Sequence, residues 1–360
     1  MGMSKESFCL KVSKKDGEKV LILAGKLDLS DKSLVIQKDA SADFLFIPIT
    51  RAPDIKELSI LIAEVPLFEL EKKSFLQKSR QDKTLSEILQ NELTSELLNS
   101  LPRALDVIGD IAIIEVPSEL EGHKTTLGAA ILKTHHNLRT VLAKIGAISG
   151  IYRLREFEFI AGEHKTTTLH KEYGCSYYVD VAKAYFSPRL SHEHWRVASL
   201  VKKVETIVDL FAGVGPFAIP IARSNRTAKV YAIDINPEAV EYLKKNVRLN
   251  KVDNQVFPVV GDARKVVEER LQGVADRVIM NLPETANEFI DVACKAVKSS
   301  GGILHFYGFV RMPDTLENFQ QFFSETVMKA GRKVEKFEYA NTVRATAPYE
   351  WQVVLDAQIL

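Results

Sequence analysis

The sequence is poor in cysteine, with only Cys9, Cys175 and Cys294 among its 360 residues. Because the three are odd in number and far apart, they exclude a disulfide framework and a metal site built from a CxxC pair. Free thiols are typical of a reducing compartment, so we expect a cytoplasmic protein.

Long apolar runs and metal-ligand clusters are also missing. No apolar run approaches the length of a membrane span, and Glu6 breaks the myristoylation pattern. His135 and His136 are adjacent and do not share a helix face, and His164 and His170 have no clustered cysteines or acids nearby. We therefore expect no membrane contact and no metal in the chemistry.

A large net charge is absent as well, since the chain carries only +1 at pH 7. The charge is unevenly placed: residues 123–204 contain 13 Lys and Arg against six Asp and Glu, and seven of the eight histidines. Aromatic residues are interleaved there: Tyr152, Phe157, Phe159, Tyr173, Tyr177, Tyr178, Tyr185 and Trp195. Cations bind phosphates and aromatic faces hold extruded bases, so the segment predicts RNA binding. The alternative is a solvated charged face over an aromatic core.

One loop is the most informative feature present. Asp209-Leu-Phe-Ala-Gly-Val-Gly-Pro-Phe217 follows the apolar run 206–208 and precedes the apolar run 217–222. These runs predict a buried strand, a tight loop and a helix packed on a sheet. The loop then lies at the carboxyl end of a strand, where ligands of open α/β sheets bind.

The residues of the loop indicate which class of ligand it binds. Gly213 and Gly215 allow a tight turn close to a ligand, and Asp209 places a carboxylate there. Ala218 stands where a dinucleotide fingerprint needs a third glycine, and the loop lacks the Lys-Ser/Thr ending of a P-loop. The loop predicts a nucleoside cradle of the S-adenosylmethionine type, the alternative being a glycine-rich turn without a ligand.

Three more predicted strands end in polar side chains. Asp234 comes about twenty residues after the glycines, a spacing suited to both ribose hydroxyls. Asp262 follows the next strand and can accept a hydrogen bond from an adenine amino group. The strand after that ends in Asn281-Leu-Pro283.

The chain resembles a known family at these motifs. Tyr185-Phe-Ser-Pro-Arg-Leu-Ser-His-Glu193, residues 208–217 and Asn281-Leu-Pro283 resemble the archaeal and eukaryotic tRNA (guanine-37-N1)-methyltransferases. Tyr152-Arg-Leu-Arg-Glu156 and Ala161-Gly-Glu163 are also similar to that family. The resemblance covers residues from roughly 80 to 360 and, less clearly, the first seventy.

The resemblance implies the cofactor, the partner and the site. It implies S-adenosylmethionine, a tRNA read at the anticodon loop and by its overall shape, a monomer, and no obligate protein partner. Residues matching Arg153, Tyr185, Glu193, Asn281 and Pro283 would gather around guanine and the methyl donor. The expected cofactor-binding residues are Asp209, Phe211, Gly213, Gly215, Pro216, Asp234, Ile235, Asn236, Asp262, Ala263, Asn281 and Pro283.

Methylation of guanine N1 defines the expected catalytic roles. N1 carries a proton at neutral pH, so a general base must remove it and a cation must stabilise the charge on O6. We predict Glu193 as the base and Arg153 as the cation, with Asn281 at the base edge and Tyr185 packed on cofactor or base. Alternatively, Glu193 is a surface carboxylate and Arg153 pairs with Glu156 or Glu158.

One departure from the family concerns position 194. The family often has Arg after the catalytic Glu, and here the residue is His194. We expect this change to cost a permanent cation near the site, because histidine is charged only when protonated.

Other chemistries remain as alternatives. Exocyclic amino methyltransferases typically have Asn/Asp-Pro-Pro-aromatic, and Glu284 in the aromatic position disfavours them. The wyosine-pathway aminocarboxypropyltransferase shares the fold and cofactor, and activity on a wyosine precursor is a further possibility. A non-catalytic RNA-binding protein would tolerate loss of the motif residues, all of which are present. A protein or small-molecule methyltransferase leaves the basic segment without a role.

The expected fold is α/β, a class I (Rossmann-like) S-adenosylmethionine methyltransferase domain after an α+β RNA-binding region and a small N-terminal α+β domain. The expected domains are 1–68, a small domain suspected to contact the tRNA elbow; 69–82, a charged linker; 83–185, the basic, aromatic substrate-binding domain; and 186–360, the methyltransferase domain. Apolar runs in the first domain occupy 8–12, 20–23, 44–48 and 58–62.

The middle region is expected to have helices at 84–98 and 126–136 and strands at 104–114, 140–145, 150–159 and 177–182. A helix at about 189–201 leads into the cofactor sheet. That sheet is expected to have seven strands, the last two a hairpin, at 206–208, 229–234, 255–263, 276–280, 302–307, 333–339 and 351–355. Its other helices are expected at 217–222, 238–249 and 315–330.

Overall fold

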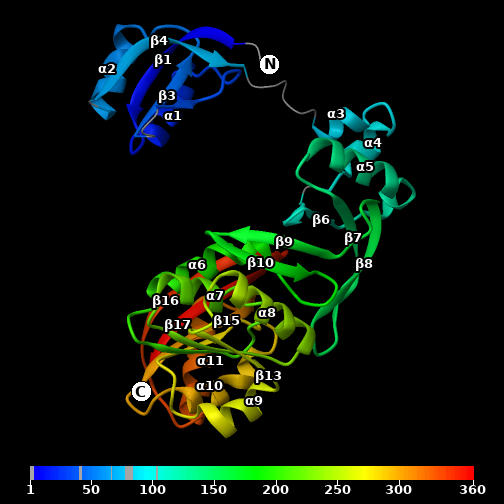
Figure 1. Ribbon diagram of the computed structural model, residues 1–360, viewed down its shortest axis with the longest axis vertical. Coiled ribbons are helices and arrows are strands. Elements are labelled where there is room, and N and C mark those ends of the chain that lie inside the picture. The colour runs from blue at the N-terminus through cyan, green and yellow to red at the C-terminus, as the bar shows by residue number, and fades with distance from the viewer. Residues whose placement is uncertain (1–3, 40–42, 66, 78–83, 103) are drawn as a thin grey trace. The chain divides into compact units, whose positions relative to one another are not determined.

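Two compact units make up the chain, Met1–Thr84 and Leu85–Leu360. The computed structural model describes residues 4–39, 43–65, 67–77, 84–102 and 104–360 (Figure 1). No helix in these described ranges is long and apolar enough to cross a membrane.

The N-terminal unit is a four-stranded sheet with two helices, in the strand order β2-β3-β1-β4. Its elements are β1 (Ser4–Ser13), α1 (Gly17–Lys26), β2 (Gln37–Lys38), β3 (Phe44–Ile49), α2 (Ile55–Glu64) and β4 (Phe68–Leu76). The apolar runs 8–12 and 44–48 lie in strands, whereas 20–23 and 58–62 lie in helices. A capping box between Asp54 and Glu57 starts α2. The expected α+β architecture is confirmed.

The linker predicted at 69–82 is wrong over its first half. Residues 69–76 belong to β4, which pairs antiparallel with β1 from Val12↔Phe68 to Ser4↔Leu76. The strand lies at the edge of the sheet and buries only Phe75. An edge strand with charged side chains toward water has the composition of a linker, which explains the error. Residues 78–82 of the predicted linker lie outside the described residues.

The second unit begins with a helical cluster and a four-stranded sheet, in the order β5-β6-β7-β8. Its elements are α3 (Leu85–Leu89), α4 (Ser95–Asn99), β5 (Asp106–Ile108), β6 (Ile111–Ile114), the 3₁₀ helix η1 (Ser118–His123), α5 (Lys124–Thr134), β7 (Thr140–Ser149) and β8 (Leu154–Gly162). The helix predicted at 84–98 is two short helices, because Thr94 caps a new one at Ser95. The strand predicted at 104–114 is a hairpin that turns at Gly109, with φ of 58°.

The strand predicted at 150–159 starts later than expected. Residues 150–153 form a tight turn, in which Gly150 has φ of 70° and Arg153 has φ of 55°. β8 begins only at Leu154. Arg153 therefore lies on a turn, which changes the partners open to its side chain.

The large sheet has the strand order β13-β12-β11-β14-β15-β17-β16. The first five strands run parallel, and β17 pairs antiparallel with both β15 and β16. The strands are β11 (Thr206–Asp209), β12 (Lys229–Asp234), β13 (Val256–Val260), β14 (Arg277–Met280), β15 (Gly302–Arg311), β16 (Val334–Ala347) and β17 (Glu350–Ile359). This confirms the seven-stranded class I plan with a terminal hairpin.

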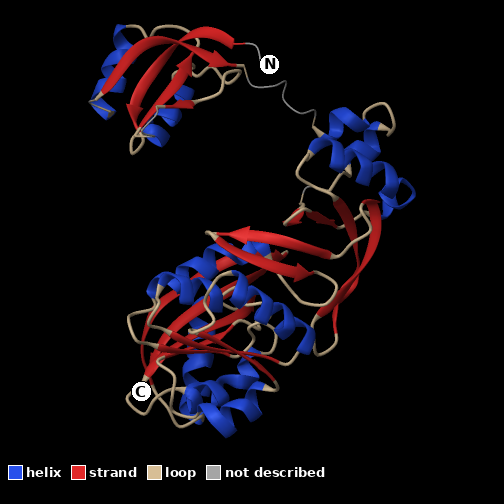
Figure 2. Cartoon of the chain, viewed as in Figure 1, coloured by secondary structure: helices blue, strands red, loops and turns tan. Residues whose placement is uncertain are grey.

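Helices cover both faces of the large sheet (Figure 2). They are η2 (Pro188–Leu190), α6 (Ser191–Leu200), α7 (Ala218–Ser224), α8 (Pro237–Leu249), α9 (Ala263–Val266), η3 (Val267–Leu271), η4 (Ala286–Phe289), α10 (Ile290–Ala296) and α11 (Leu316–Lys329). Ile207 packs with α7 and α8 on one face, and Val208 packs with α10 and α11 on the other. This alternation of apolar side chains along β11 places the loop after Asp209 between two covered faces.

A two-stranded ribbon, β9 (Thr167–Glu172) and β10 (Cys175–Asp180), lies against α8. Only β10 was expected from the sequence. Asn246 accepts from Tyr178 N at 2.7 Å and donates to Tyr178 O at 3.1 Å. Asn250, one helical turn later, makes the same pair of bonds to Ser176, at 2.9 and 2.6 Å. Two side chains of a helix thus make the hydrogen bonds that a neighbouring strand would make.

We predict that Asn246→Ala lowers the free energy of unfolding by about 3 kcal/mol, because three hydrogen bonds of a fully buried amide are lost. Urea denaturation measures the change. Exposed Asn254→Ala is the matched control, with an expected change within about 0.5 kcal/mol. Equal stability of the two variants would show that the hydrogen bonds of Asn246 contribute nothing to the free energy of unfolding.

Candidate functional site

Asp209 lies at the end of β11 with its side chain fully buried. Its Oδ1 accepts from Phe211 N at 3.3 Å, and its Oδ2 has no hydrogen-bond partner among the described residues. Burial raises the pKa of Asp209 to about 7, and the nearby Asp234 carboxylate adds to the effect. A buried carboxylate oxygen without a donor fits a ligand that brings a positive charge.

Asp234, at the end of β12, holds the glycine loop. Its Oδ2 accepts from Gly213 N at 2.7 Å and its Oδ1 from Asn236 N at 2.8 Å. Burial raises the pKa of Asp234, and the two N–H donors oppose that shift. The next residue, Ile235, exposes 42% of its surface and offers an apolar contact beside the carboxylate.

Asn236 has a structural role in its side chain. Its Oδ1 caps α8 by accepting from Glu238 N and Ala239 N, and its Nδ2 donates to Lys183 O at 2.7 Å. The amide is buried, and its oxygen and its nitrogen both have main-chain partners. Any contact of this residue with a cofactor is therefore left to its main chain.

Asn281 follows β14, the strand beside β11. Its Oδ1 is buried and has no hydrogen-bond partner within the described ranges. Because Asp209 pairs in register with Ile279, the two unpaired oxygens lie at the carboxyl ends of adjacent strands. Two such acceptors fit the ammonium group of S-adenosylmethionine, which donates hydrogen bonds and carries the opposite charge to Asp209.

Phe211 belongs to an aromatic wall beside the cradle. Its ring meets Phe289 edge-on at 4.9 Å, and the Arg264 guanidinium lies 3.7 Å from the Phe289 ring. Asp262 caps α9 by accepting from Arg264 N at 2.8 Å. Sequence reasoning missed Phe289 and Arg264, which follow no motif.

The glycine loop is approached closely from two sides. A Cβ on Gly215, where φ is 95°, would lie 2.5 Å from Leu243 Cδ1. The Tyr185 carbonyl lies 3.7 Å from the position of a Cβ on Gly213, so the Tyr185 segment crosses the loop. The Tyr185 side chain itself is exposed. Among the other predicted cofactor-binding residues, Pro216 and Pro283 are half-buried and Ala263 is buried in α9.

Glu193 lies in the first turn of α6 and is only 4% exposed, so the surface alternative is wrong. The Arg196 guanidinium approaches both carboxylate oxygens, at 3.1 and 3.0 Å, and Tyr307 OH donates to Oε2 at 2.9 Å. Phe217, directly after the glycine loop, lies between this helix and Tyr307, with its ring 5.8 Å from that of Tyr307. Glu193 therefore faces a guanidinium and a hydroxyl donor near the cradle and keeps acceptor capacity.

The expected loss of a permanent cation at position 194 is wrong. Arg196, three residues after Glu193, supplies that cation, and the i,i+3 spacing on the predicted helix could have indicated it. His194 is buried and faces elsewhere: its Nδ1 lies 2.9 Å from Glu172 Oε2, and its ring lies edge-on to Phe217 at 4.8 Å.

Arg153 pairs with Glu284, not with Glu156 or Glu158. Its NH1 and NH2 donate to the two carboxylate oxygens of Glu284, which follows Asn281-Leu-Pro283 directly. Arg153 lowers the pKa of Glu284, so that carboxylate is ionised at neutral pH. The pair brings the turn before β8 to the end of β14.

The predicted site residues therefore form three neighbouring groups. Asp209, Gly213, Asp234 and Asn281 meet at the strand ends. Glu193 packs with Arg196 and Tyr307, and Arg153 joins the Asn281 segment through Glu284. No hydrogen bond among the described residues joins Glu193 directly to Arg153 or Asn281.

The aromatic residues of the basic segment divide between surface and core. Exposed ones are Tyr152, Tyr173, Tyr178, Tyr185 and Trp195, whereas Tyr177 is buried. Tyr173 and Trp195 stack with their ring centroids 5.3 Å apart. Exposed, stacked rings among cations support the RNA-binding prediction over the core alternative.

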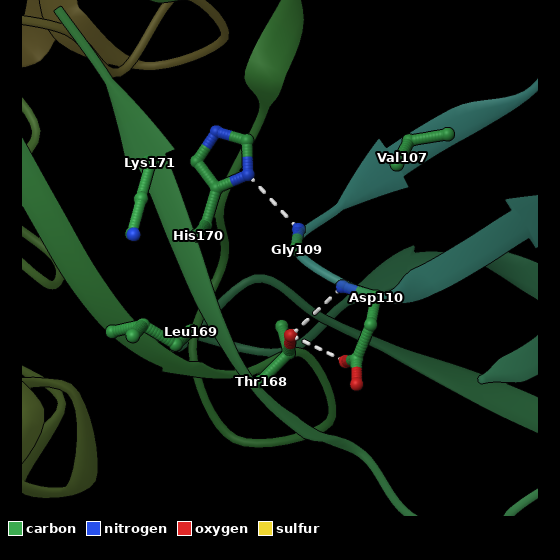
Figure 3. A pocket seen from close by; sticks show the side chains of 7 residues that line it. All are labelled: Val107, Gly109, Asp110, Thr168, Leu169, His170 and Lys171. Carbon is green, nitrogen blue, oxygen red and sulfur yellow. Dashed lines mark hydrogen bonds between the residues drawn. The ribbon is translucent and has the colours of Figure 1, made fainter. Parts of the chain in front are cut away.

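A hollow of about 430 Å³ lies away from these groups, between the β5–β6 turn and β9 (Figure 3). Thr168 Oγ1 accepts from Asp110 N at 3.1 Å and donates to the Asp110 carboxylate at 2.7 Å, and Gly109 N donates to His170 Nδ1 at 3.0 Å. No predicted site residue lines it. It is a crevice where the ribbon meets the hairpin, and the unpaired oxygens of Asp209 and Asn281 are stronger indicators of a ligand.

Three family models match the chain. The TRM5/TYW2 methyltransferase domain matches residues 168–337, the TYW2 N-terminal domain matches 85–166, and the tRNA methyltransferase 5 N-terminal domain matches 9–57.

Curated relatives include enzymes of two reaction types. A tRNA (guanine(37)-N(1))-methyltransferase, Trm5b, of Pyrococcus abyssi is 38% identical over 98% of this chain and 99% of its own. A tRNA 4-demethylwyosine(37)-methyltransferase, Taw21, of Saccharolobus solfataricus is 36% identical over 76% of this chain and 98% of its own. A tRNA(Phe) (4-demethylwyosine(37)-C(7)) aminocarboxypropyltransferase of Pyrococcus horikoshii is 35% identical over 76% of this chain and 96% of its own.

Solved structures with the same architecture include complexes. One of aTrm5 with tRNALeu has a TM-score of 0.67 and 32% identity, covering 98% of this chain and 100% of that chain. One of Methanocaldococcus jannaschii TYW2 with AdoMet has a TM-score of 0.55 and 30% identity, covering 71% of this chain and 99% of that chain.

The raised pKa of Asp209 predicts a pH dependence of stability without cofactor. The folded chain keeps a proton on Asp209 up to about pH 7, while the unfolded chain loses it near pH 4, so stability falls as pH rises between the two values. We expect the parent to lose about 3 kcal/mol more than Asp209→Asn between pH 5 and pH 8. Urea denaturation at both pH values measures the difference, with exposed Asp253→Asn as control. Parallel curves for the parent and Asp209→Asn would disprove the assignment.

Proposed function

This chain belongs to the TRM5/TYW2 family of S-adenosylmethionine-dependent tRNA methyltransferases, and we propose that it transfers a methyl group to N1 of guanosine 37 of tRNA. The observation that carries the proposal is Glu193, a buried carboxylate that faces the Arg196 guanidinium beside the cradle. Transfer to a protonated ring nitrogen needs such a base. The match of residues 9–57 to the tRNA methyltransferase 5 N-terminal domain also supports it.

The cofactor is S-adenosylmethionine. When bound, it supplies a methyl group on a sulfonium. Asp209 and Asn281 hold its ammonium group, Asp234 accepts from the ribose hydroxyls, and Asp262 accepts from the adenine amino group. Ile235 and Phe211 give apolar contacts, while Gly213 and Gly215 keep the loop free of Cβ atoms there. The main chain at four further positions contributes to the cofactor site: Pro216, Asn236, Ala263 and Pro283.

The chain's own groups manage the charge on guanine. Glu193 takes the N1 proton, so N1 is left with a free lone pair. Arg153 donates to guanine O6 as charge develops there. Its guanidinium is then shared between guanine and Glu284. Asn281 contacts the base edge, and Tyr185 packs on the base or the cofactor. Since Glu193 is only 4% exposed, guanine must leave its stack to reach it.

The partner is tRNA. Exposed aromatics and the excess of cations in residues 123–204 bind the anticodon region. Residues 83–185 act as the substrate-binding domain and 186–360 as the methyltransferase domain. Residues 1–68 contact the tRNA elbow, so the enzyme tests the shape of a whole tRNA. The protein acts as a monomer in the cytoplasm.

The runner-up functions use the same cofactor. An aminocarboxypropyltransferase moves a different carbon of the sulfonium, and a methyltransferase acting on a wyosine precursor uses a tricyclic base. Relatives named for such activities match 76% of this chain, against 98% for Trm5b of Pyrococcus abyssi. The longer match favours guanosine.

A double-label experiment separates these functions. The full chain is incubated with a tRNA transcript bearing guanosine 37 and with S-adenosylmethionine labelled either in the methyl group or in the aminocarboxypropyl carbons. We expect methyl label in 1-methylguanosine after nucleoside separation. Label only from the aminocarboxypropyl carbons would overturn the proposal. A parallel reaction on tRNA carrying 4-demethylwyosine tests the precursor activity.

Glu193→Gln tests the base. We expect kcat to fall by roughly 10²–10⁴-fold with the Kd for S-adenosylmethionine unchanged, because the amide keeps the shape but cannot take a proton. Single-turnover methyl transfer and equilibrium dialysis measure the two quantities. Exposed Glu268→Gln is the matched control and should retain the parent rate. A Glu193→Gln variant with the parent rate would remove the assigned role.

A further inference from the structure

A chain of buried ionisable groups runs from Glu193 across the large sheet. Arg196 of α6 links Glu193 to Asp356 of β17, and His305 of β15 links Asp356 to Arg277 of β14. Asp356 is 2% exposed, His305 0% and Arg277 3%. Ionisable groups are costly to bury, so an unbroken line of them beside a reacting carboxylate indicates a purpose beyond packing.

Arg196 is shared between two carboxylates. Its NH1 and NH2 donate to Asp356 Oδ2 and Oδ1 at 2.5 and 3.2 Å, while its Nε faces Glu193. The guanidinium also lies 4.4 Å from the Tyr339 ring of β16. Side chains of α6, β16 and β17 thus contact one guanidinium.

His305 fixes Asp356 from the other side. Its Nδ1 lies 2.8 Å from Asp356 Oδ1, and its Nε2 lies 3.3 Å from Arg277 NH1, which can only donate. Nε2 is therefore the acceptor in that contact, and Nδ1 faces the Asp356 carboxylate. Burial alone would raise the pKa of Asp356, but His305 and Arg196 hold it below its usual range. Asp356 is therefore a permanent carboxylate.

The charge balance of this arrangement changes when Glu193 takes a proton. Beforehand, one guanidinium faces two carboxylates, Glu193 and Asp356. Afterwards Glu193 is neutral, and Arg196 with Asp356 remains a balanced pair. Without Asp356, the same proton transfer would leave a buried guanidinium uncompensated, which is the costly case.

We propose that Arg196 and Asp356 are positioning residues for the methyl-transfer reaction, which orient Glu193 and keep its surroundings electrically balanced when it accepts the guanine N1 proton. The inference rests on the proposed function, since it requires Glu193 to be the base. Arg196 and Asp356 act through Glu193 and touch neither substrate nor cofactor.

The groups that face Glu193 set the expected pH dependence. On its own helix these are Arg196 and His192, whose Nδ1 lies 3.9 Å from Oε1. Tyr307 faces it from β15, Asp356 from β17 through Arg196, and Tyr339 lies under Arg196 on β16. Burial and the Glu193 charge raise the pKa of Tyr307 well above its usual range, so its hydroxyl stays a donor.

The test is the pH profile of single-turnover methyl transfer by the full chain at saturating S-adenosylmethionine. Asp356→Asn leaves Glu193 next to an uncompensated cation, which favours its carboxylate. We expect the acidic limb to move to lower pH by about one unit and the plateau rate to fall roughly tenfold. Arg196→Met leaves two carboxylates facing each other, and the limb should move to higher pH by about one unit. Arg196→Lys, which keeps the charge, should bring the limb back toward the parent.

If a charge variant does not fold, Tyr307→Phe provides a second test, because it removes the hydroxyl that donates a hydrogen bond to Glu193. We expect its acidic limb to move to higher pH. Asp276→Asn is the matched control, because Asp276 pairs with Lys298 at the opposite, amino end of β14. Limbs that coincide with the parent in all folded variants, with unchanged cofactor binding, would overturn the proposal. A parent that forms no 1-methylguanosine would instead refute the proposed function, so the two failures are distinguishable.

Discussion

The hydrogen bond from Gly213 N to Asp234 fixes the part of the molecule on which the site depends. It ties the loop after β11 to the end of β12, while Ala212 N donates to Ile233 O in the same direction. The loop can take this path because Gly213 and Gly215 adopt positive φ. Once the loop is fixed, Asn246 reaches Val214 O, the Tyr185 carbonyl lies over Gly213, and Phe217 is placed against α6. Cradle, substrate segment and proposed base are therefore positioned by one short contact.

Three buried acids near this contact differ in the hydrogen-bond donors that face their carboxylates. Asp234 has two N–H donors, and Glu193 has a guanidinium and a hydroxyl. Asp209 has one long bond and an unpaired oxygen. The same side-chain chemistry thus gives a loop anchor, a stabilised carboxylate and an acceptor left for a ligand, because only the local donors differ. Asp209 and Asp234 meet these donors at strand ends, and Glu193 meets them in the first turn of α6.

The sequence predicted mainly those features that depend on short segments of the chain. Strand-end residues such as Asp209 and Asp234, and the helix that carries Glu193, follow from apolar periodicity and turn residues within short windows. Arg153 and Glu284 are 131 residues apart, and nothing in either segment indicates their pairing. Asp356 gives no local signal either, because it lies in a strand and its partners come from other elements. Edge strands were the weak point of the secondary-structure prediction: β4 was assigned to a linker and β9 was not expected, since both are rich in polar side chains.

The asparagine contacts between α8 and β10 have a geometric consequence. Four residues of helix rise about 6 Å, close to the advance of about 6.6 Å over two residues of strand. Asn246 and Asn250 can therefore bond to Tyr178 and Ser176 at once, whereas a one-residue slip of β10 would present residues whose N–H and C=O point toward β9. The helix α8 thus sets the register of strand β10. Glu172, at the end of the ribbon's other strand, in turn joins the ribbon to α6 through its contact with His194.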